Sequence, residues 1–490
     1  MKASPQTAAL SVLAILGVAA LSFLSVQAPW LCAWLLLFGA FVIAARVSWR
    51  TSPDPFAPLL PVTAYLFLGL GVRGLALHEN WLPDRYNIPL SDTWLTTAVF
   101  LLGALATFSC VAGYRSQTGA GLGHKWGSWQ LGGIQQISRH VILVFSLMSA
   151  VIGVASLILL HRRLGGFPGF GQTPAVLVVQ ANKGGYFTLD MLAYFPLAGV
   201  LIAWRRSDLR IFGKILLITN ILLVLSWFAL AGRKSLLFEL IFGIALLRHY
   251  LHRPIRGRLL AVALIPVLIG ISFAFYFKLY GFNTRTIATQ YSQQPLAEAV
   301  IDPLLNRSYQ FDAATVILAK TKSVSDYKLG GTFSDLLWFY IPRQWWPGKP
   351  VSFSYSFAAE YFPAAPDRTS AYTPGMVGEL YLNFGIPGVA VGFYVFGLIL
   401  RACYEAFARR ATRLETAMYI VILWRLTQMV EGPITTHIQF VLAESLPIGI
   451  LIIAVRFLPN ARLAIFSQAS DPVQRITYQN VSSRPLEMES

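Results

Sequence analysis

The sequence predicts an all-α protein, a polytopic membrane helical bundle of about 12 transmembrane helices with one large loop. The first observation is composition: of 490 residues, 56% are hydrophobic and 12% are charged, whereas soluble proteins carry about 25% charged residues. The second is a series of apolar runs, each long enough to cross about 30 Å of hydrocarbon. The third is the placement of Lys and Arg, which gather in alternate connections between these runs.

The apolar runs define the expected organisation of the chain. They lie near residues 8–27, 29–46, 57–77, 94–113, 140–160, 188–204, 211–231, 234–250, 258–277, 380–402, 415–430 and 438–457. Residues 1–277 would hold transmembrane helices 1–9, residues 278–373 a large loop, residues 374–457 helices 10–12, and residues 458–490 a polar tail. The first run resembles a signal peptide, but a second run follows it directly, so we expect a retained helix.

The basic residues predict the orientation of the chain. With the N-terminus inside, the inner segments hold 22 Lys and Arg residues and the short outer loops hold 7. The positive-inside rule therefore places both termini and the 458–490 tail in the cytoplasm, and the 278–373 loop on the outer side. The net charge of +17 does not predict nucleic-acid binding, because the basic residues form no single face.

The large outer loop has two notable segments. Residues 295–321 carry apolar side chains at helical spacing, which predicts one or two amphipathic helices at the membrane-water boundary. Residues 340–350 read YIPRQWWPGKP. Trp345 and Trp346 suit the headgroup level, and the prolines hold Arg343 and Lys349 in place. This segment is either an interfacial anchor or a rigid cationic rim for an anionic headgroup.

Further cations lie at the outer ends of helices. Arg233 and Lys234 form a tight outer turn, and Arg307 precedes Asp312 on a predicted interfacial helix. Such groups suit a lipid pyrophosphate, because charge-assisted hydrogen bonds are strong in a partly dry site. The alternatives are side chains that reach toward headgroups and, for Arg307, a solvated helix face.

Charged residues within the predicted spans are the strongest functional candidates. Glu379 lies in YTPGMVGELYLNFGIPG, whose glycines and proline predict a broken helix, which membranes tolerate where backbone is buried or lines a wet cavity. Glu431 and His437 follow in a short outer turn, and Arg425 lies in the preceding span. A structural ion pair of Arg425 with Glu379 or Glu431 is the competing interpretation. Glu239 and Glu444, also within spans, could be packing partners only.

No other chemistry is indicated. The sequence lacks a phosphate-binding glycine loop, a His-Glu-x-x-His motif and a Gly-x-Ser-x-Gly motif. We therefore expect no nucleotide, no metal and no other cofactor.

Several stretches resemble the oligosaccharide repeat-unit polymerases of bacterial envelopes, namely the O-antigen and enterobacterial common antigen polymerases. The resemblance lies in FYIPRQWWPGKP, in SYSFAAEYF, in YTPGMVGELYLNFGIPG, and in AGRKS and FKLYGFN. It covers about residues 225–400.

The resemblance implies a membrane glycosyltransferase of the bacterial inner membrane. Such enzymes move a growing glycan from undecaprenyl pyrophosphate onto a second lipid-linked repeat unit at the periplasmic side, for lipopolysaccharide or exopolysaccharide. The implied partners are the two lipid-linked glycans, membrane lipids, a chain-length regulator and a flippase. The candidate catalytic residues are Glu379, Glu431 and His437, with Glu379 favoured as the base. The candidate substrate-binding residues are Arg233, Lys234, Arg307, Arg343, Lys349, Arg425, Trp345, Trp346 and Tyr381.

Two alternatives remain at this point. An O-antigen ligase uses the same donor but a different acceptor, and the Trp-Pro-Gly-Lys-Pro run argues mildly against it. A secondary transporter would account for twelve spans, but it should show internal two-fold symmetry, which one large loop late in the chain breaks.

Overall fold

The computed structural model describes most of the membrane-embedded chain. The described residues are 28–52, 54–81, 92–130, 137–164, 187–205, 209–231, 234–255, 308–339, 345–350, 353–362, 373–407 and 412–457, together with 269, 270, 272, 289, 305 and 341. The expected first span near 8–27, most of the expected span near 258–277, and the 458–490 tail lie outside them.

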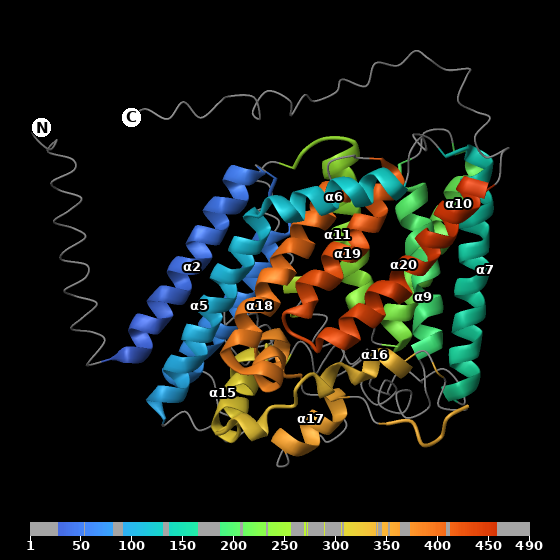
Figure 1. The fold of residues 1–490 in the computed structure, drawn as a ribbon. Helices are drawn as coiled ribbons and strands as arrows, with labels where there is room; N and C mark the ends of the chain where they lie inside the picture. The colour runs from blue at the N-terminus through green and yellow to red at the C-terminus, as the bar shows by residue number, and fades with distance from the viewer. Residues whose placement is uncertain are drawn as a thin grey trace, which may run out of the picture.

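Within these residues every regular element is a helix (Figure 1). The long helices are α2 (Pro29–Thr51), α5 (Thr93–Arg115), α6 (Gln117–Gln130), α7 (Arg139–Leu164), α9 (Phe187–Ala203), α10 (Ile211–Ala231), α11 (Lys234–Leu251), α18 (Gly375–Phe407), α19 (Arg413–Met429) and α20 (Ile434–Phe457). Between α2 and α5, α3 (Leu59–Phe67), a π-helical turn η1 (Leu68–Val72) and α4 (Arg73–His78) form one rod. The remaining elements are α15 (Gln310–Lys320), η2 (Val324–Asp326), η3 (Gly331–Ser334), α16 (Asp335–Trp338) and α17 (Phe353–Tyr361).

The helical membrane character of the fold is confirmed in its coarse form. Among the described residues, 7 helices are long and apolar enough to cross a membrane. They are Pro29–Thr51, Leu59–His78, Thr93–Arg115, Arg139–Arg162, Ile211–Leu230, Gly375–Phe407 and Ile434–Phe457. Large apolar side chains stand exposed on α2, α7 and α10, including Leu36, Val151 and Ile211, as lipid contact requires. The predicted runs at 188–204, 234–250 and 415–430 are helices too, namely α9, α11 and α19.

The bundle has two distinct ends (Figure 1). Elements α15, α16 and α17 lie at one end, and α6 lies across the other; we call them the loop end and the α6 end. Basic residues occupy the last turns of helices that finish at the α6 end, namely Arg50, Arg115, Arg248 and Arg456. Basic side chains therefore gather at the helix ends of the α6 end.

Small residues allow the central helices to approach closely. At the crossing of α5 and α18, a Cβ atom on Gly113 would lie 2.0 Å from the carbonyl oxygen of Tyr394. A Cβ atom on Gly397 would lie 2.1 Å from the carbonyl oxygen of Cys110. Glycine is thus required on both helices, as is common where membrane helices pack by van der Waals contact. This crossing fixes α18, which carries Glu379, against the centre of the bundle.

The predicted interfacial helix is buried in the bundle instead. A helix does form within the predicted segment, as α15, but its residues Gln310–Ile317 are all buried. The helix packs against α18, α5 and η1. The reason is a buried ion pair: Arg73 donates to the carboxylate of Asp312 and its Nη1 donates to the carbonyl of Leu305. Because the pair satisfies the polar groups on both sides, α15 closes onto the helical core.

Candidate functional site

The predicted break in the helix around Glu379 is present in α18. Gly385 has φ 65° and ψ −153°, a backbone conformation that residues with a side chain rarely adopt. The break frees the carbonyls of Leu382 and Asn383, which accept hydrogen bonds from the N–H groups of Lys328 and Leu329. The first segment of α18, residues 375–384, is therefore joined to residues 328–330 at the loop end.

Glu379 lies in this first segment with its carboxylate fully enclosed. Its side chain is 0% exposed. Oε1 accepts a hydrogen bond of 2.9 Å from the Thr332 hydroxyl, and Oε2 accepts one of 2.7 Å from the backbone N–H of Ile434. Ile434 is the first residue of α20, and the positive end of a helix dipole favours a negative charge there. The carboxylate thus has a fixed orientation and two donors.

Asn383 holds Thr332 in place beside Glu379. Its Nδ2 donates to the Thr332 hydroxyl oxygen at 2.7 Å and to the carbonyl of Glu379 at 2.8 Å. Its Oδ1 accepts from the N–H of Gly330 at 2.8 Å. The Asn383 side chain therefore holds η3 against Glu379 by hydrogen bonds. Thr332 occupies the position that another hydroxyl would need in order to reach the carboxylate.

The structure brings the three candidate catalytic residues to one turn, between α19 and α20. Glu431 lies in the turn and accepts a hydrogen bond from the Tyr65 hydroxyl. His437 lies in the first turn of α20, buried, and a Cβ atom on Gly432 would come within 2.1 Å of its Nε2. Glu379 contacts the same turn through Ile434. Residues more than 50 positions apart in the sequence thus share one small region at the loop end.

Arg425 forms a buried ion pair, but with neither of the predicted partners. Its guanidinium donates to both carboxylate oxygens of Glu444. It also donates to the Tyr194 hydroxyl at 2.8 Å and to Gln428 Oε1 at 2.7 Å, and it stands 4.5 Å from the centre of the Phe440 ring. The prediction of a pair with Glu379 or Glu431 is therefore wrong, because Glu444 on the next helix is closer. Glu444 is accordingly more than a packing residue.

The aromatic loop is described only in part. Trp345 is 81% exposed and Trp346 38% exposed, and the Trp346 ring stands edge-on to Trp338 at 6.2 Å. Lys349 Nζ donates to the carbonyls of Phe339 and Ile341, at 3.1 and 2.9 Å. This closes the loop on itself. Tyr381 is half-buried and meets Tyr327 edge-on at 6.1 Å.

The other candidate cations are not placed by the structure. Arg233, Arg307 and Arg343 lie outside the described residues, and for Lys234 the structure describes only its backbone position, the first residue of α11. The cation that pairs with Asp312 is Arg73, from a helix some 240 positions away in the sequence. The charge pattern assigns Arg73 to a short outer loop, but it is buried in α4.

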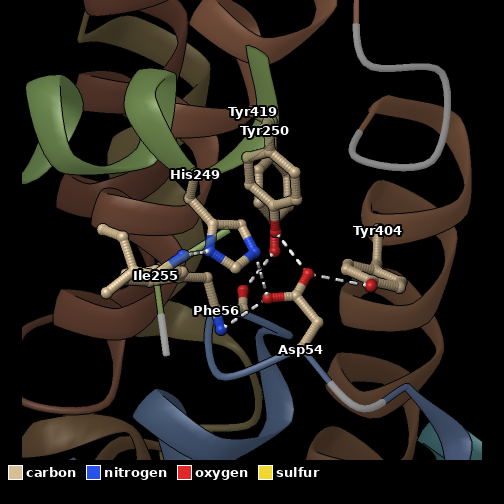
Figure 2. Close-up of polar contacts among 7 residues, drawn as sticks. All are labelled: Asp54, Phe56, His249, Tyr250, Ile255, Tyr404 and Tyr419. Atoms are coloured by element: carbon tan, nitrogen blue, oxygen red, sulfur yellow. Dashed lines mark hydrogen bonds and ion pairs between the residues drawn. The ribbon is translucent and has the colours of Figure 1, made fainter. Parts of the chain in front are cut away.

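A second polar cluster, which the sequence did not suggest, lies at the α6 end (Figure 2). The carboxylate of Asp54, between α2 and α3, accepts hydrogen bonds from the hydroxyls of Tyr250 and Tyr404 at 2.6 and 2.9 Å. It also accepts one from the N–H of Phe56 at 2.8 Å, and His249 Nε2 lies 3.3 Å away. His249 Nδ1 accepts from the N–H of Ile255, so the imidazole proton stands on the nitrogen that faces Asp54.

The Asp54 cluster joins four parts of the fold. His249 and Tyr250 end α11, Tyr404 ends α18, and Tyr419 of α19 donates to the carbonyl of Phe56. Burial alone would raise the pKa of Asp54, but the hydrogen bonds from His249, Tyr250 and the Phe56 N–H together lower it. Both carboxylate oxygens of Asp54 already accept hydrogen bonds from the protein, so the cluster fits a structural junction. A lone Asp in a short connection gave no signal of this in the sequence.

Comparison with known proteins gave no match, either to a family model, to a curated protein or to a solved structure. The functional argument therefore rests on the residues themselves. Among the described residues, no group of three or more His, Cys, Asp and Glu side chains gathers in a way that could hold a metal ion.

Proposed function

We propose that this protein polymerises undecaprenyl-pyrophosphate-linked oligosaccharide repeat units into a surface polysaccharide, at the periplasmic face of the bacterial inner membrane. The observation that carries the proposal is the meeting of Glu379, Glu431 and His437 at the α19–α20 turn. Groups able to take a proton thus gather at the end of the bundle that also holds the cationic, aromatic loop.

Glu379 is the proposed base, and Thr332 indicates how an acceptor would reach it. The Thr332 hydroxyl makes to Oε1 the kind of O–H···O bond that an acceptor sugar hydroxyl would make. When η3 moves away, the acceptor hydroxyl takes its place. Glu379 then takes the hydroxyl proton while the oxygen bonds to the anomeric carbon of the donor. The bond from that carbon to the pyrophosphate breaks, and undecaprenyl pyrophosphate leaves.

The departing pyrophosphate must be stabilised by positive charge, and the proposed reaction uses no nucleotide. Cations placed where the pyrophosphate charge develops would lower the barrier electrostatically. Arg233, Lys234, Arg307 and Arg343 are the proposed groups, with Trp345, Trp346 and Tyr381 as apolar surfaces for lipid and sugar. Lys349 and Arg425 contribute through position, because Lys349 closes the aromatic loop and Arg425 supports the helices that flank the α19–α20 turn.

The proposed orientation follows from the unequal ends of the bundle. Basic residues at the α6 end would face the cytoplasm, and the loop end would face the periplasm. A reporter that is active only in the periplasm should be active when fused near Tyr355 and silent when fused near Arg410. The reverse pattern would place the chemistry on the wrong side of the membrane.

A gene deletion tests the proposed reaction in cells. Without the protein, single repeat units linked to undecaprenyl pyrophosphate should accumulate and long chains should vanish, and both effects should be reversed by the wild-type chain. Accumulation of long lipid-linked chains would instead identify a ligase, which acts after polymerisation. Unchanged lipid-linked pools would contradict both reactions.

A further inference from the structure

A second acidic group lies beside the Arg425–Glu444 ion pair. Glu239 in α11 is 0% exposed, and neither of its carboxylate oxygens accepts a hydrogen bond from any residue that the structure describes. Glu239 interacts electrostatically with two charged groups, Glu444 of α20 and Arg425 of α19. The Tyr194 hydroxyl, from α9, belongs to the same group of interacting side chains. Glu239 therefore has another carboxylate as a neighbour and, among the described residues, no hydrogen-bond donor.

The charges of this cluster do not balance. Arg425 carries one positive charge, and Glu444 accepts hydrogen bonds from it through both oxygens, so that pair is neutral. An ionised Glu239 would leave one negative charge in the bundle interior, where an unpaired charge is strongly disfavoured. His437 also interacts electrostatically with Arg425. Some further positive species must therefore accompany Glu239.

We propose that Glu239 and Glu444 form a proton-binding site, in which the two carboxylates share one proton beside Arg425. The proton supplies the missing donor and the missing charge together, since a protonated Glu239 donates to Glu444 as two adjacent carboxyl groups do. A metal ion is less suited, because metal cations prefer several oxygen ligands and two of the oxygens here already accept from Arg425. This inference does not depend on the glycosyl transfer proposed above.

Glu239→Gln is the direct test, because the amide mimics a protonated carboxyl group in size and in its ability to donate. The full-length protein in lipid nanodiscs is unfolded thermally from about pH 5 to about pH 9, in sodium chloride and in choline chloride of equal ionic strength. Glu360→Gln is the matched control, since Glu360 is an exposed acid on α17.

The wild-type protein should lose thermal stability as the pH rises, because the folded state keeps a proton on the Glu239–Glu444 pair that the unfolded state releases. Glu239→Gln should keep the stability of the low-pH wild type and lack that part of the pH dependence, while Glu360→Gln should behave as wild type. Sodium and choline should give equal melting temperatures. An identical pH dependence in Glu239→Gln and wild type would overturn the proposal, as would sodium stabilising wild type but not Glu239→Gln.

Infrared spectroscopy gives a second readout. The spectrum of wild type minus that of Glu239→Gln should contain the carbonyl band of a protonated carboxylic acid at neutral pH, shifted in D2O. Absence of this band would contradict a bound proton. Glu239→Met provides a further check, since it is neutral and of similar length. If neither Glu239→Gln nor Glu239→Met accumulates in the membrane, the anionic form is required and the proposal is wrong.

Discussion

The carboxylate of Glu379 accepts a hydrogen bond of 2.7 Å from the backbone N–H of Ile434, the first residue of α20. The first segment of α18 is thereby tied to the N-terminus of another helix, whose free N–H groups favour a negative charge. The backbone N–H of Met376 also donates to the carbonyl of Val430, at 3.0 Å. The loop end of α18, which carries Glu379, is thus held in register with the α19–α20 turn, next to Glu431 and His437.

Glu379→Gln should abolish polymerisation and leave the fold intact. The amide oxygen still accepts from Ile434 and the amide nitrogen can donate to the Thr332 oxygen, but the basicity is lost. Cells should accumulate single lipid-linked repeat units, and the protein should remain in the membrane at its normal level. Chain-length ladders and an immunoblot measure the two effects.

Companion variants locate the base. Thr332→Val removes the hydroxyl that covers Glu379 without touching the carboxylate, so long chains should still form. Glu360→Gln, on the exposed surface of α17, serves as the neutral control. Normal ladders from Glu379→Gln, together with short products from Glu431→Gln or His437→Ala, would move the base to the α19–α20 turn.

Glu444→Gln should strongly destabilise the protein, because it removes the carboxylate that accepts hydrogen bonds from the buried Arg425 guanidinium through both of its oxygens, a geometry that Glu239 does not supply. Removal of one member of a buried ion pair costs about 3–5 kcal/mol. The double variant Arg425→Met, Glu444→Met should lose much less stability, because no uncompensated charge remains. Thermal unfolding in detergent measures both. Equal losses in the single and double variants would show that packing, not charge, dominates at this site.

Asp54→Asn should loosen the junction at the α6 end and reduce stability by about 1.5–3 kcal/mol, the range for hydrogen bonds to a charged group. The pKa of Asp54 in the folded state is lowered below its unfolded value of about 3.9. The contribution of the carboxylate is therefore present above about pH 4 and is lost as the pH falls through the folded-state pKa. Wild type should lose stability on acidification below about pH 4 more steeply than Asp54→Asn. Parallel acid-unfolding curves would argue against this role.

Gly385→Ala should destabilise the break in α18. At a positive φ an L-residue costs about 1–2 kcal/mol, and the added Cβ would meet the Tyr327 hydroxyl oxygen at 2.6 Å. Gly449→Ala in α20 is the matched control, since no atom of the described residues lies within 4 Å of the position that its added Cβ would take. Melting temperatures should fall for Gly385→Ala and stay near wild type for Gly449→Ala. A harmless Gly385→Ala would mean that the break can straighten.

Hydrophobicity and local backbone rules predicted most of the helices. The run at 211–231 coincides with α10, and glycine and proline around Glu379 predicted a broken helix, whose break the structure places at Gly385. Helix α6 was missed, because its sequence is rich in glycine and polar residues and it is held by contact with α18. Partners distant in the sequence were also missed. Glu444 for Arg425 and Asp312 for Arg73 depend on which helices become neighbours, and a single sequence carries no direct record of that.

The most direct test of the proposed function is polymerisation by the purified protein alone. The full chain in nanodiscs is given undecaprenyl-pyrophosphate-linked repeat units isolated from its source organism, without any nucleotide or added metal. We predict products with two or more repeat units, one undecaprenyl pyrophosphate released for each new glycosidic bond, and no activity with Glu379→Gln. Substrate that remains as single repeat units, under conditions where the same preparation restores chains in membranes lacking the protein, would contradict transfer by this chain itself.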